Sequence, residues 1–166
     1  MSQKIDKRED IQILDYKPEY RSAFKDLNVE WITKYFEMEE ADYRVLNNPD
    51  SEIIEKGGRI LIALYNGVPA GTCALLKMNN SDSTVELVKM AVSPKVRGIG
   101  IGWELGKAVT TVAKEMGANK IFLEGNTNLK ASISLYHKLG FKRIEGVTSP
   151  YKRVDIQMEL DLNEDI

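Results

Sequence analysis

Three glycines at alternate positions, Gly98, Gly100 and Gly102, separate a strand-like apolar segment from a segment with helical periodicity. The pattern predicts a strand at Thr84–Val92 and a helix directly after the loop. At the start of such a helix, glycines leave backbone N–H groups uncovered, and these donors act together with the positive end of the helix dipole. Arg97 adds a cation at the same place. The loop is therefore predicted to bind an anion such as a phosphate group.

The loop does not match two common phosphate-binding motifs. The G-x-G-x-x-G pattern of dinucleotide-binding folds would need a last glycine where Trp103 or Leu105 stands. A Walker A motif would need Ser or Thr after Gly106-Lys107, where Ala108 follows instead. A glycine-rich turn without a ligand is the remaining alternative, and the strand-to-helix setting makes it the less favoured one.

The hydrophobic periodicity along the chain changes from an antiparallel first half to strand–helix–strand units. In the first helix the apolar stripe is predicted to be Tyr20, Phe24, Leu27, Trp31 and Tyr35. The predicted elements are, in order, a strand at 11–14, helices at 18–36 and 39–46, strands at 59–65, 68–78 and 84–92, a helix at 101–116, a strand at 121–124, a helix capped by Thr127 or Asn128 and ended by Gly140, and strands near 141–145 and 153–160. The pair Asn66-Gly67 predicts a two-residue hairpin, and residues 79–83 form a polar turn. This pattern is typical of an α/β protein.

Composition narrows the function classes. The 166 residues carry 43% hydrophobic and 29% charged side chains with a formal net charge of −2, so the chain shows no basic excess for nucleic acid. No apolar stretch is long enough to span a membrane, and residues 1–10 lack the apolar stretch of a secretory signal. Cys73 is the only cysteine and His137 the only histidine, which excludes an internal disulfide and a Cys/His zinc cluster. We expect a cytoplasmic protein without a metal.

Two sequence blocks carry a family resemblance. The first, Arg97-Gly98-Ile99-Gly100-Ile101-Gly102, resembles the R/Q-x-x-G-x-G/A signature of the GNAT N-acetyltransferases. The second, downstream at the distance typical of the family, reads Asn128-x-x-Ala131-x-x-x-Leu135-Tyr136-x-x-Leu139-Gly140-Phe141. The resemblance implies one domain over residues 1–166, with a core at about 11–160. Its fold would be a GNAT-like mixed, mostly antiparallel sheet that is splayed in the middle, with helices on both faces.

The resemblance also implies acetyl-CoA as the acyl donor. Backbone groups of the strand before the loop would pair with the pantetheine arm, the loop amides would hold the pyrophosphate, and two residues of the second block would contact the donor. The implied donor-binding residues are Met90, Ala91, Val92, Arg97, Gly98, Ile99, Gly100, Ile101, Gly102, Trp103, Asn128 and Tyr136.

Two side chains are candidates for proton transfer. Tyr136 matches the position where GNAT enzymes commonly place the acid that protonates the thiolate, and its alternative is a core aromatic residue. Glu86 is the candidate base, because an extended strand would place it on an apolar face with Val88, Met90 and Val92, where burial raises a carboxyl pKa. Some GNAT enzymes have a basic glutamate at this place. The alternatives for Glu86 are a carboxylate paired with a cation and an enzyme that uses ordered water.

The acceptor is predicted to be a small-molecule or peptide amine. In GNAT proteins the first helices border the acceptor site, so Trp31, Tyr35 or Phe36 would form a wall of the pocket, with Glu86 attracting the ammonium group. Helix packing is the alternative for these aromatic residues. A non-catalytic acyl-CoA-binding module and a plain interaction domain are the competing functions, and a homodimer is left open.

Overall fold

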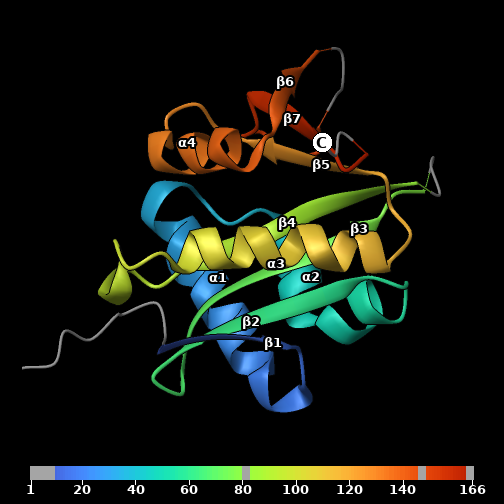
Figure 1. Ribbon diagram of the computed structural model, residues 1–166. Helices are drawn as coiled ribbons and strands as arrows, with labels where there is room; N and C mark the ends of the chain where they lie inside the picture. Colours follow the sequence, from blue (N-terminus) through green and yellow to red (C-terminus); the bar gives the residue numbers. More distant parts are fainter. Residues whose placement is uncertain (1–9, 80–82, 146–148, 164–166) are drawn as a thin grey trace, which may run out of the picture.

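The computed structural model describes residues 10–79, 83–145 and 149–163. Among these residues, seven strands form one sheet in the order β1-β2-β3-β4-β5-β7-β6, with β4 and β5 parallel and the other neighbours antiparallel (Figure 1). The strands are β1 Ile11–Asp15, β2 Arg59–Tyr65, β3 Val68–Lys77, β4 Thr84–Val92, β5 Lys120–Gly125, β6 Lys142–Ile144 and β7 Ile156–Asp161. The α/β class and the mixed, mostly antiparallel sheet are as predicted.

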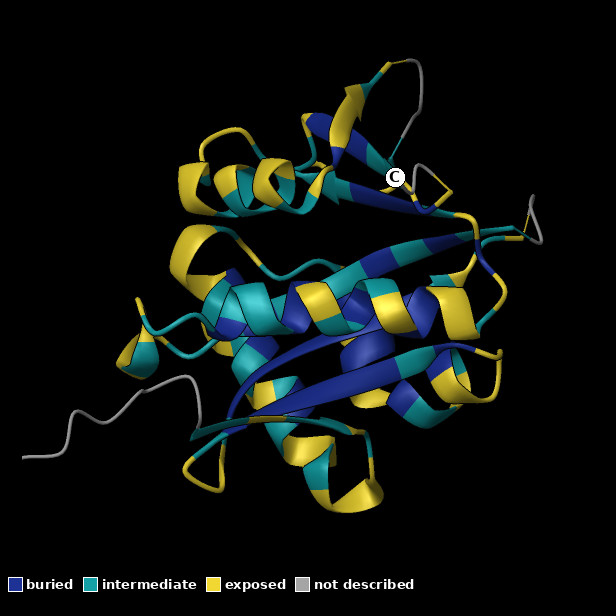
Figure 2. Cartoon of the chain, viewed as in Figure 1, coloured by how far each residue is buried: buried dark blue, intermediate teal, exposed yellow. Residues whose placement is uncertain are grey.

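Four helices cover the two faces of the sheet. They are α1 Arg21–Tyr35, α2 Glu40–Asn47, α3 Ile101–Glu115 and α4 Lys130–Leu139, and short helical turns lie at Pro18–Tyr20, Asp50–Ile54 and Pro94–Val96. One hydrophobic core joins α1 and α2 to one face, and a second core joins α3 and α4 to the other. β2 and β3 are buried on both faces (Figure 2). No helix in the described part of the chain is both long and apolar enough to cross a membrane.

The turn residues behave as their chemistry predicts. Asn66 and Gly67 have φ values of 51° and 80°, the left-handed pair that a tight two-residue hairpin requires. Gly140 ends α4 at φ 103°, as predicted. The middle of the polar turn predicted at 79–83 lies outside the described residues.

The sheet is splayed between β4 and β5. These strands pair only between Thr84–Leu87 and Lys120–Leu123, and beyond this point they diverge (Figure 1). A bulge in β4 accompanies the divergence: Lys89 has φ 54°, and the register with β3 shifts between Thr72 and Ala74.

The bulge also corrects the predicted face of β4. Val88 packs with the α1/α2 core, whereas Met90 and Val92 pack with the α3/α4 core. The prediction that Glu86, Val88, Met90 and Val92 share a face is therefore wrong, because the bulge reverses the alternation of side chains at Lys89. The prediction assumed a regular strand.

Several predicted boundaries and caps differ from the observed ones. The α-helix begins at Arg21 because Pro18–Tyr20 form a 3-10 turn. Neither predicted cap holds α4, because the Thr127 hydroxyl donates to Asp155 at 2.8 Å and no side-chain cap bond is formed at the N-cap Leu129. β7 begins at Ile156, not 153.

The buried face of α1 also differs from the predicted stripe. Phe24, Asn28 and Ile32 are buried, whereas Trp31 is half-buried and Tyr35 is 39% exposed. Phe24 of the predicted stripe therefore lies on the buried face, whereas Trp31 and Tyr35 lie at its border. This leaves the aromatic side chains at the end of α1 next to open space.

Candidate functional site

Two hollows meet beside the splayed part of β4. The first, which we call the loop groove, has a cavity volume of about 390 Å³ and lies between the glycine loop, the end of β4 and α4. The second, the central pocket, has a volume of about 110 Å³ and lies under the end of α1 and residues 151–154. Trp31, Met90, Leu129 and Tyr136 line both hollows. The two spaces therefore adjoin at the side chains of Met90 and Tyr136.

The backbone of the loop leaves room beside the start of α3. Gly98 and Gly100 have φ values of 79° and 95°, which glycine adopts without strain. A Cβ atom on Gly98 would meet no other atom within 4 Å, so the space above it is open. The first N–H groups of α3 have no partner within the helix, as at every helix start, and Gly98 and Gly102 line the groove. The loop thus has the donors and the space for an anion.

A glycine at position 102 is also required by the packing of α3 against α4. A Cβ atom on Gly102 would lie 3.2 Å from Leu135, and one on Gly106 would lie 2.5 Å from Leu139. These two glycines, one turn apart on α3, let two leucines of α4 approach closely. Gly102 therefore serves helix packing as well as lining the groove.

The end of α1 contacts the loop through Arg97. The guanidinium of Arg97 donates a hydrogen bond of 2.9 Å to the hydroxyl of Tyr35, and this contact lowers the pKa of Tyr35. Tyr35 lines the loop groove but not the central pocket, whereas Phe36 lines the central pocket. The two neighbouring aromatic residues thus face different hollows.

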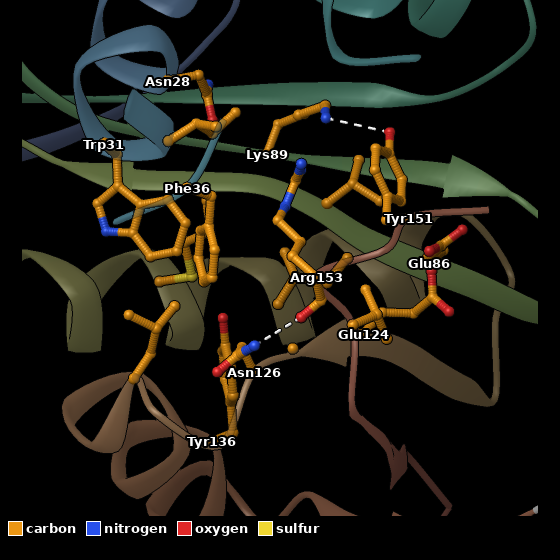
Figure 3. A pocket seen from close by; sticks show the side chains of 17 residues that line it. Asn28, Trp31, Phe36, Glu86, Lys89, Glu124, Asn126, Tyr136, Tyr151 and Arg153 are labelled. Carbon is orange, nitrogen blue, oxygen red and sulfur yellow. Dashed lines mark hydrogen bonds between the residues drawn. The ribbon is translucent and has the colours of Figure 1, made fainter. Parts of the chain in front are cut away.

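The central pocket has an aromatic end and an acidic end (Figure 3). Trp31 and Phe36 lie at one end, and Glu86 and Glu124 lie together at the other. Burial raises the pKa of Glu86 to about 7, and the charge of Glu124 adds to the effect. Glu86 is thus a carboxyl group that can take or release a proton near neutral pH.

Glu124 is held in place by neighbours on both carboxylate oxygens. Oε1 accepts a hydrogen bond of 3.1 Å from Ser149, and Oε2 accepts one of 3.0 Å from Gln157. Gln157 is itself buried and lies opposite Glu124 on β7. The carboxylate of Glu124 is therefore fixed at the acidic end.

A cluster of ion-paired side chains forms part of the wall of the central pocket through Lys89 and Arg153. The carboxylate of Asp42, on α2, is fully buried and accepts from Lys89 Nζ at 2.6 Å and from two nitrogens of Arg153 at 2.7 and 2.8 Å. Arg153 also donates to Glu39 at 3.1 Å. Burial opposes ionisation of Asp42, but the hydrogen bonds from Arg153, Lys89 and the Glu39 N–H outweigh it and lower the pKa to about 2. We call Glu39, Asp42, Lys89 and Arg153 the ionic cluster.

Aromatic rings hold the cations of the ionic cluster. The guanidinium carbon of Arg153 lies 4.5 Å from the ring centroid of Tyr151 and 6.0 Å from that of Phe36. Lys89 also donates to the Tyr151 hydroxyl at 3.2 Å (Figure 3). The alternative in which Glu86 pairs with Lys89 does not occur, because Asp42 takes the ammonium group.

Tyr136 lies at the junction of the two hollows. It projects from α4, its ring packs edge-on against Phe141 with centroids 5.9 Å apart, and its side chain joins the α3/α4 core. Burial raises the pKa of Tyr136 to about 12, with a further contribution from Cys73. The phenol is therefore protonated at neutral pH. It is both a packed aromatic residue and a lining residue of both hollows, so the two sequence interpretations are compatible.

Most of the predicted site residues line one or both hollows, whereas Gly100 and Trp103 line neither. The loop groove takes Trp31, Tyr35, Met90, Ala91, Val92, Arg97, Gly98, Gly102, Asn128 and Tyr136, and the central pocket takes Trp31, Phe36, Glu86, Met90 and Tyr136. Ile101 is buried in the core and Ile99 packs against it, so these two side chains face inward. The roles predicted for all these residues stay predictions.

Sequence reasoning missed several pocket residues. Asn28, Lys89, Asn126, Tyr151 and Arg153 line the central pocket. None of them stood out in the sequence: Asn28 lies outside the predicted apolar stripe, and the structure places it on the buried face of α1, 1% exposed. Its amide nitrogen donates to the Phe24 carbonyl at 2.9 Å.

Comparisons with known proteins give the family. The model of the acetyltransferase (GNAT) family matches residues 19–141, which include the loop, the splayed strands and all of α4. The chain belongs to the GNAT family. The predicted resemblance is thereby confirmed, and this GNAT chain is an acyltransferase of the N-acetyltransferase type.

Relatives and solved structures agree with the family. The chain is 29% identical over 119 residues to the uncharacterized N-acetyltransferase YjgM of Escherichia coli K12, covering 71% of this chain and 67% of YjgM. The match covers less than half of the length of several other curated relatives. A GNAT-family acetyltransferase structure from Staphylococcus aureus Mu50 aligns with a TM-score of 0.82 and 20% identity, covering 92% of this chain and 99% of that one.

A third comparison concerns the fold. The structure of YncA from Salmonella typhimurium, solved with acetyl-CoA, aligns with a TM-score of 0.73 and 20% identity, covering 94% of this chain and 96% of YncA. In this GNAT chain the loop groove has open space over Gly98, helix-start amides and the Arg97 cation at one end, and the edge of β4 that does not pair with β5 along its side.

Proposed function

We propose that this GNAT protein is an acetyl-CoA-dependent N-acetyltransferase in which a primary amine attacks the donor directly. The observation that carries the proposal is that the loop groove and the central pocket adjoin at Met90 and Tyr136. A donor in one and an amine in the other would bring their reactive ends together in a ternary complex. When bound, acetyl-CoA supplies the activated acetyl group.

The chain's own residues supply two proton positions. Glu86, with its pKa near 7, would accept a proton from the acceptor's ammonium group, directly or through water. Tyr136 would donate a proton to the departing sulfur, since its phenol stays protonated at neutral pH. The loop amides with Arg97 would hold the donor's phosphates, and β4 backbone groups at Met90–Val92 would hold its pantetheine arm.

Direct attack is favoured over a covalent enzyme intermediate on Cys73. The thiol is fully buried and burial raises its pKa, so it is neither accessible nor ionised. If the protein were a non-catalytic acyl-CoA-binding module, the presence of both Glu86 and Tyr136 in the lining of one pocket would have no role.

The test is release of the CoA thiol from acetyl-CoA with a broad amine panel of amino acids, polyamines, aminoglycosides, simple alkyl and aryl amines and peptide N-termini. We expect at least one acceptor class to accelerate thiol release and to yield an N-acetylated product by mass spectrometry. If acetyl-CoA raises the melting temperature but no amine is acetylated, the protein is a binding module and not an enzyme.

A further inference from the structure

Within the described part of the chain, and among the charged side chains that line the central pocket, the carboxyl groups, and not the cations, are left without an ionic partner for a ligand to replace. The two cations that line it, Lys89 and Arg153, are both bonded to Asp42, and Arg153 is also bonded to Glu39. Their side chains are only 6% and 16% exposed. Within the ionic cluster, two cations and two carboxylates therefore cancel.

The other two charged residues lining the pocket are carboxyl groups. Glu86 and Glu124 lie together at the acidic end (Figure 3), and Glu124 is bonded to the neutral groups of Ser149 and Gln157. A cationic amine is the ligand that neutralises this end. An acceptor carboxylate would add to its charge.

The ionic cluster does not readily turn toward a ligand. Lys89 and Arg153 keep further N–H donors, but Asp42, whose side chain is fully buried, compensates their positive charge, and neither cation can move away from it without cost. An uncompensated buried carboxylate is strongly unfavourable. The positive charges of Lys89 and Arg153 are therefore compensated by the protein and are poorly suited to bind an acceptor carboxylate.

The rest of the pocket surface suits an apolar body. Trp31 and Phe36 form its aromatic end, and Met90, Leu129 and Tyr136 continue the apolar lining toward the loop groove. Aromatic walls favour flat apolar groups through burial and ring contacts.

We propose that the acceptor is a cationic amine with an apolar, aromatic body and no carboxylate, selected by Glu124 at the acidic end and by Asp42, which withholds Lys89 and Arg153. This inference rests on the proposed function. It gives Glu124 and Asp42 a role in specificity, whereas Glu86 and Tyr136 serve the chemistry.

The test compares three acceptors that differ at one group: phenethylamine, phenylalanine and phenylalaninamide. We expect phenethylamine to be acetylated with a kcat/KM at least 100-fold greater than that of phenylalanine. Phenylalaninamide, which is as large as phenylalanine but lacks its negative charge, should recover at least 10-fold over phenylalanine. Equal or faster acetylation of phenylalanine would overturn the proposal.

Single-residue variants then test whether Glu124 is responsible for the preference for a cationic amine. Glu124→Gln should raise the phenethylamine KM at least 10-fold, leave the acetyl-CoA KM unchanged and move the acidic limb of the pH–rate profile to lower pH, since a charge beside Glu86 is lost. Glu159→Gln, on the adjacent strand β7, is the control and should change none of these. Unchanged amine KM and pH profile in Glu124→Gln would contradict the proposal.

Asp42→Asn should narrow the preference for the amine over phenylalanine at least 10-fold, because Lys89 and Arg153 are released. The Asp42→Asn variant is assayed below its own melting temperature. If it does not fold, the result for Glu124→Gln tests the proposal. Failure of the inference and of the proposed function are distinguishable: acetylation of other amines but not of phenethylamine refutes only the inference, whereas no acetylation of any amine in the broad panel refutes both.

Discussion

Burial raises the pKa of both Tyr136 and Glu86, but it suits the phenol to donate a proton and the carboxylate to accept one. Burial raises the pKa of each group above its ordinary value, to about 12 for Tyr136 and about 7 for Glu86. For the phenol this keeps the proton on at every physiological pH. For the carboxyl group it moves the titration into the range where a base is useful.

Replacement of Tyr136 by Phe tests the proton donor. The ring contact with Phe141 remains, so we expect acetyl-CoA to bind with its normal affinity while kcat falls about 10²-fold or more, the usual size of a general-acid contribution. Tyr43→Phe, at an exposed position of α2, is the matched control. Equal turnover by Tyr136→Phe and the parent protein would leave Tyr136 with only its packing role.

Replacement of Glu86 by Gln tests the base through pH. Because the carboxyl group must be deprotonated to accept a proton, kcat/KM of the parent should fall as pH decreases through about 7. In Glu86→Gln the rate should be lower and this acidic limb should be absent. Steady-state rates from mildly acidic to mildly alkaline pH measure it, and an unchanged limb would assign the proton to water or to another residue.

At the scale of elements, the loop before α3 and the end of α1 divide the site between donor and acceptor. The loop depends on left-handed backbone at Gly98 and Gly100, while the last turn of α1 sends Tyr35 to the loop and leaves Phe36 at the pocket. Mutations in these two elements should therefore affect different substrates.

Gly100→Glu should abolish acetyl-CoA binding, because it places a negative charge beside the phosphate donors. Gly100→Ala is the matched control, since at φ 95° it carries the same backbone strain without the charge. Acetyl-CoA at about 100 times its Kd should stabilise the parent protein by about 2.7 kcal/mol. A normal acetyl-CoA-induced rise in melting temperature in Gly100→Glu would refute the loop assignment.

Phe36→Ala and Tyr35→Phe should separate the two substrates. Loss of the Phe36 ring should raise the acceptor KM about 10-fold and leave the acetyl-CoA KM within about 2-fold. Loss of the Tyr35 hydroxyl removes a hydrogen bond to Arg97 and should weaken acetyl-CoA binding by about 2- to 5-fold with the acceptor KM unchanged. If both variants affect only thermal stability, neither the Phe36 ring nor the Tyr35 hydroxyl serves a substrate.

At the scale of the whole molecule, the ionic cluster joins parts of the chain that the splay separates. Asp42 lies on α2, Lys89 lies at the β4 bulge and Arg153 precedes β7, on the far side of β5. The cluster closes the pocket on the face opposite α3 and α4. It should therefore contribute to stability as well as to specificity.

Arg153→Met tests this contribution. Removal of one partner of a buried pair costs about 3–5 kcal/mol, and we expect about 2 kcal/mol here because Asp42 keeps Lys89 and Arg153 is partly exposed. Arg143→Met, which removes an exposed pair with Glu145, should cost less than about 0.5 kcal/mol. Urea unfolding at neutral pH compares them, and equal midpoints would show that the cluster adds no stability.

Features that depend on local backbone chemistry could be predicted from the sequence. The hairpin at Asn66-Gly67, the stop at Gly140, the limits of β4 and the glycine loop before α3 were all predictable, because each follows from the residues at that position. The loop and the block around Tyr136 were also sufficient to indicate the family.

The shape and charge of the central pocket, in contrast, depend on how distant segments of the chain pack together. The bulge at Lys89 depends on the register of β3, and no local pattern marks it. Asp42 and Arg153 are 111 residues apart and meet only because α2 and the segment before β7 pack over the same face. Glu86 owes its raised pKa to burial and to Glu124 on another strand. Burial and long-range pairing depend on how elements pack, and that information is not contained in any single stretch of sequence.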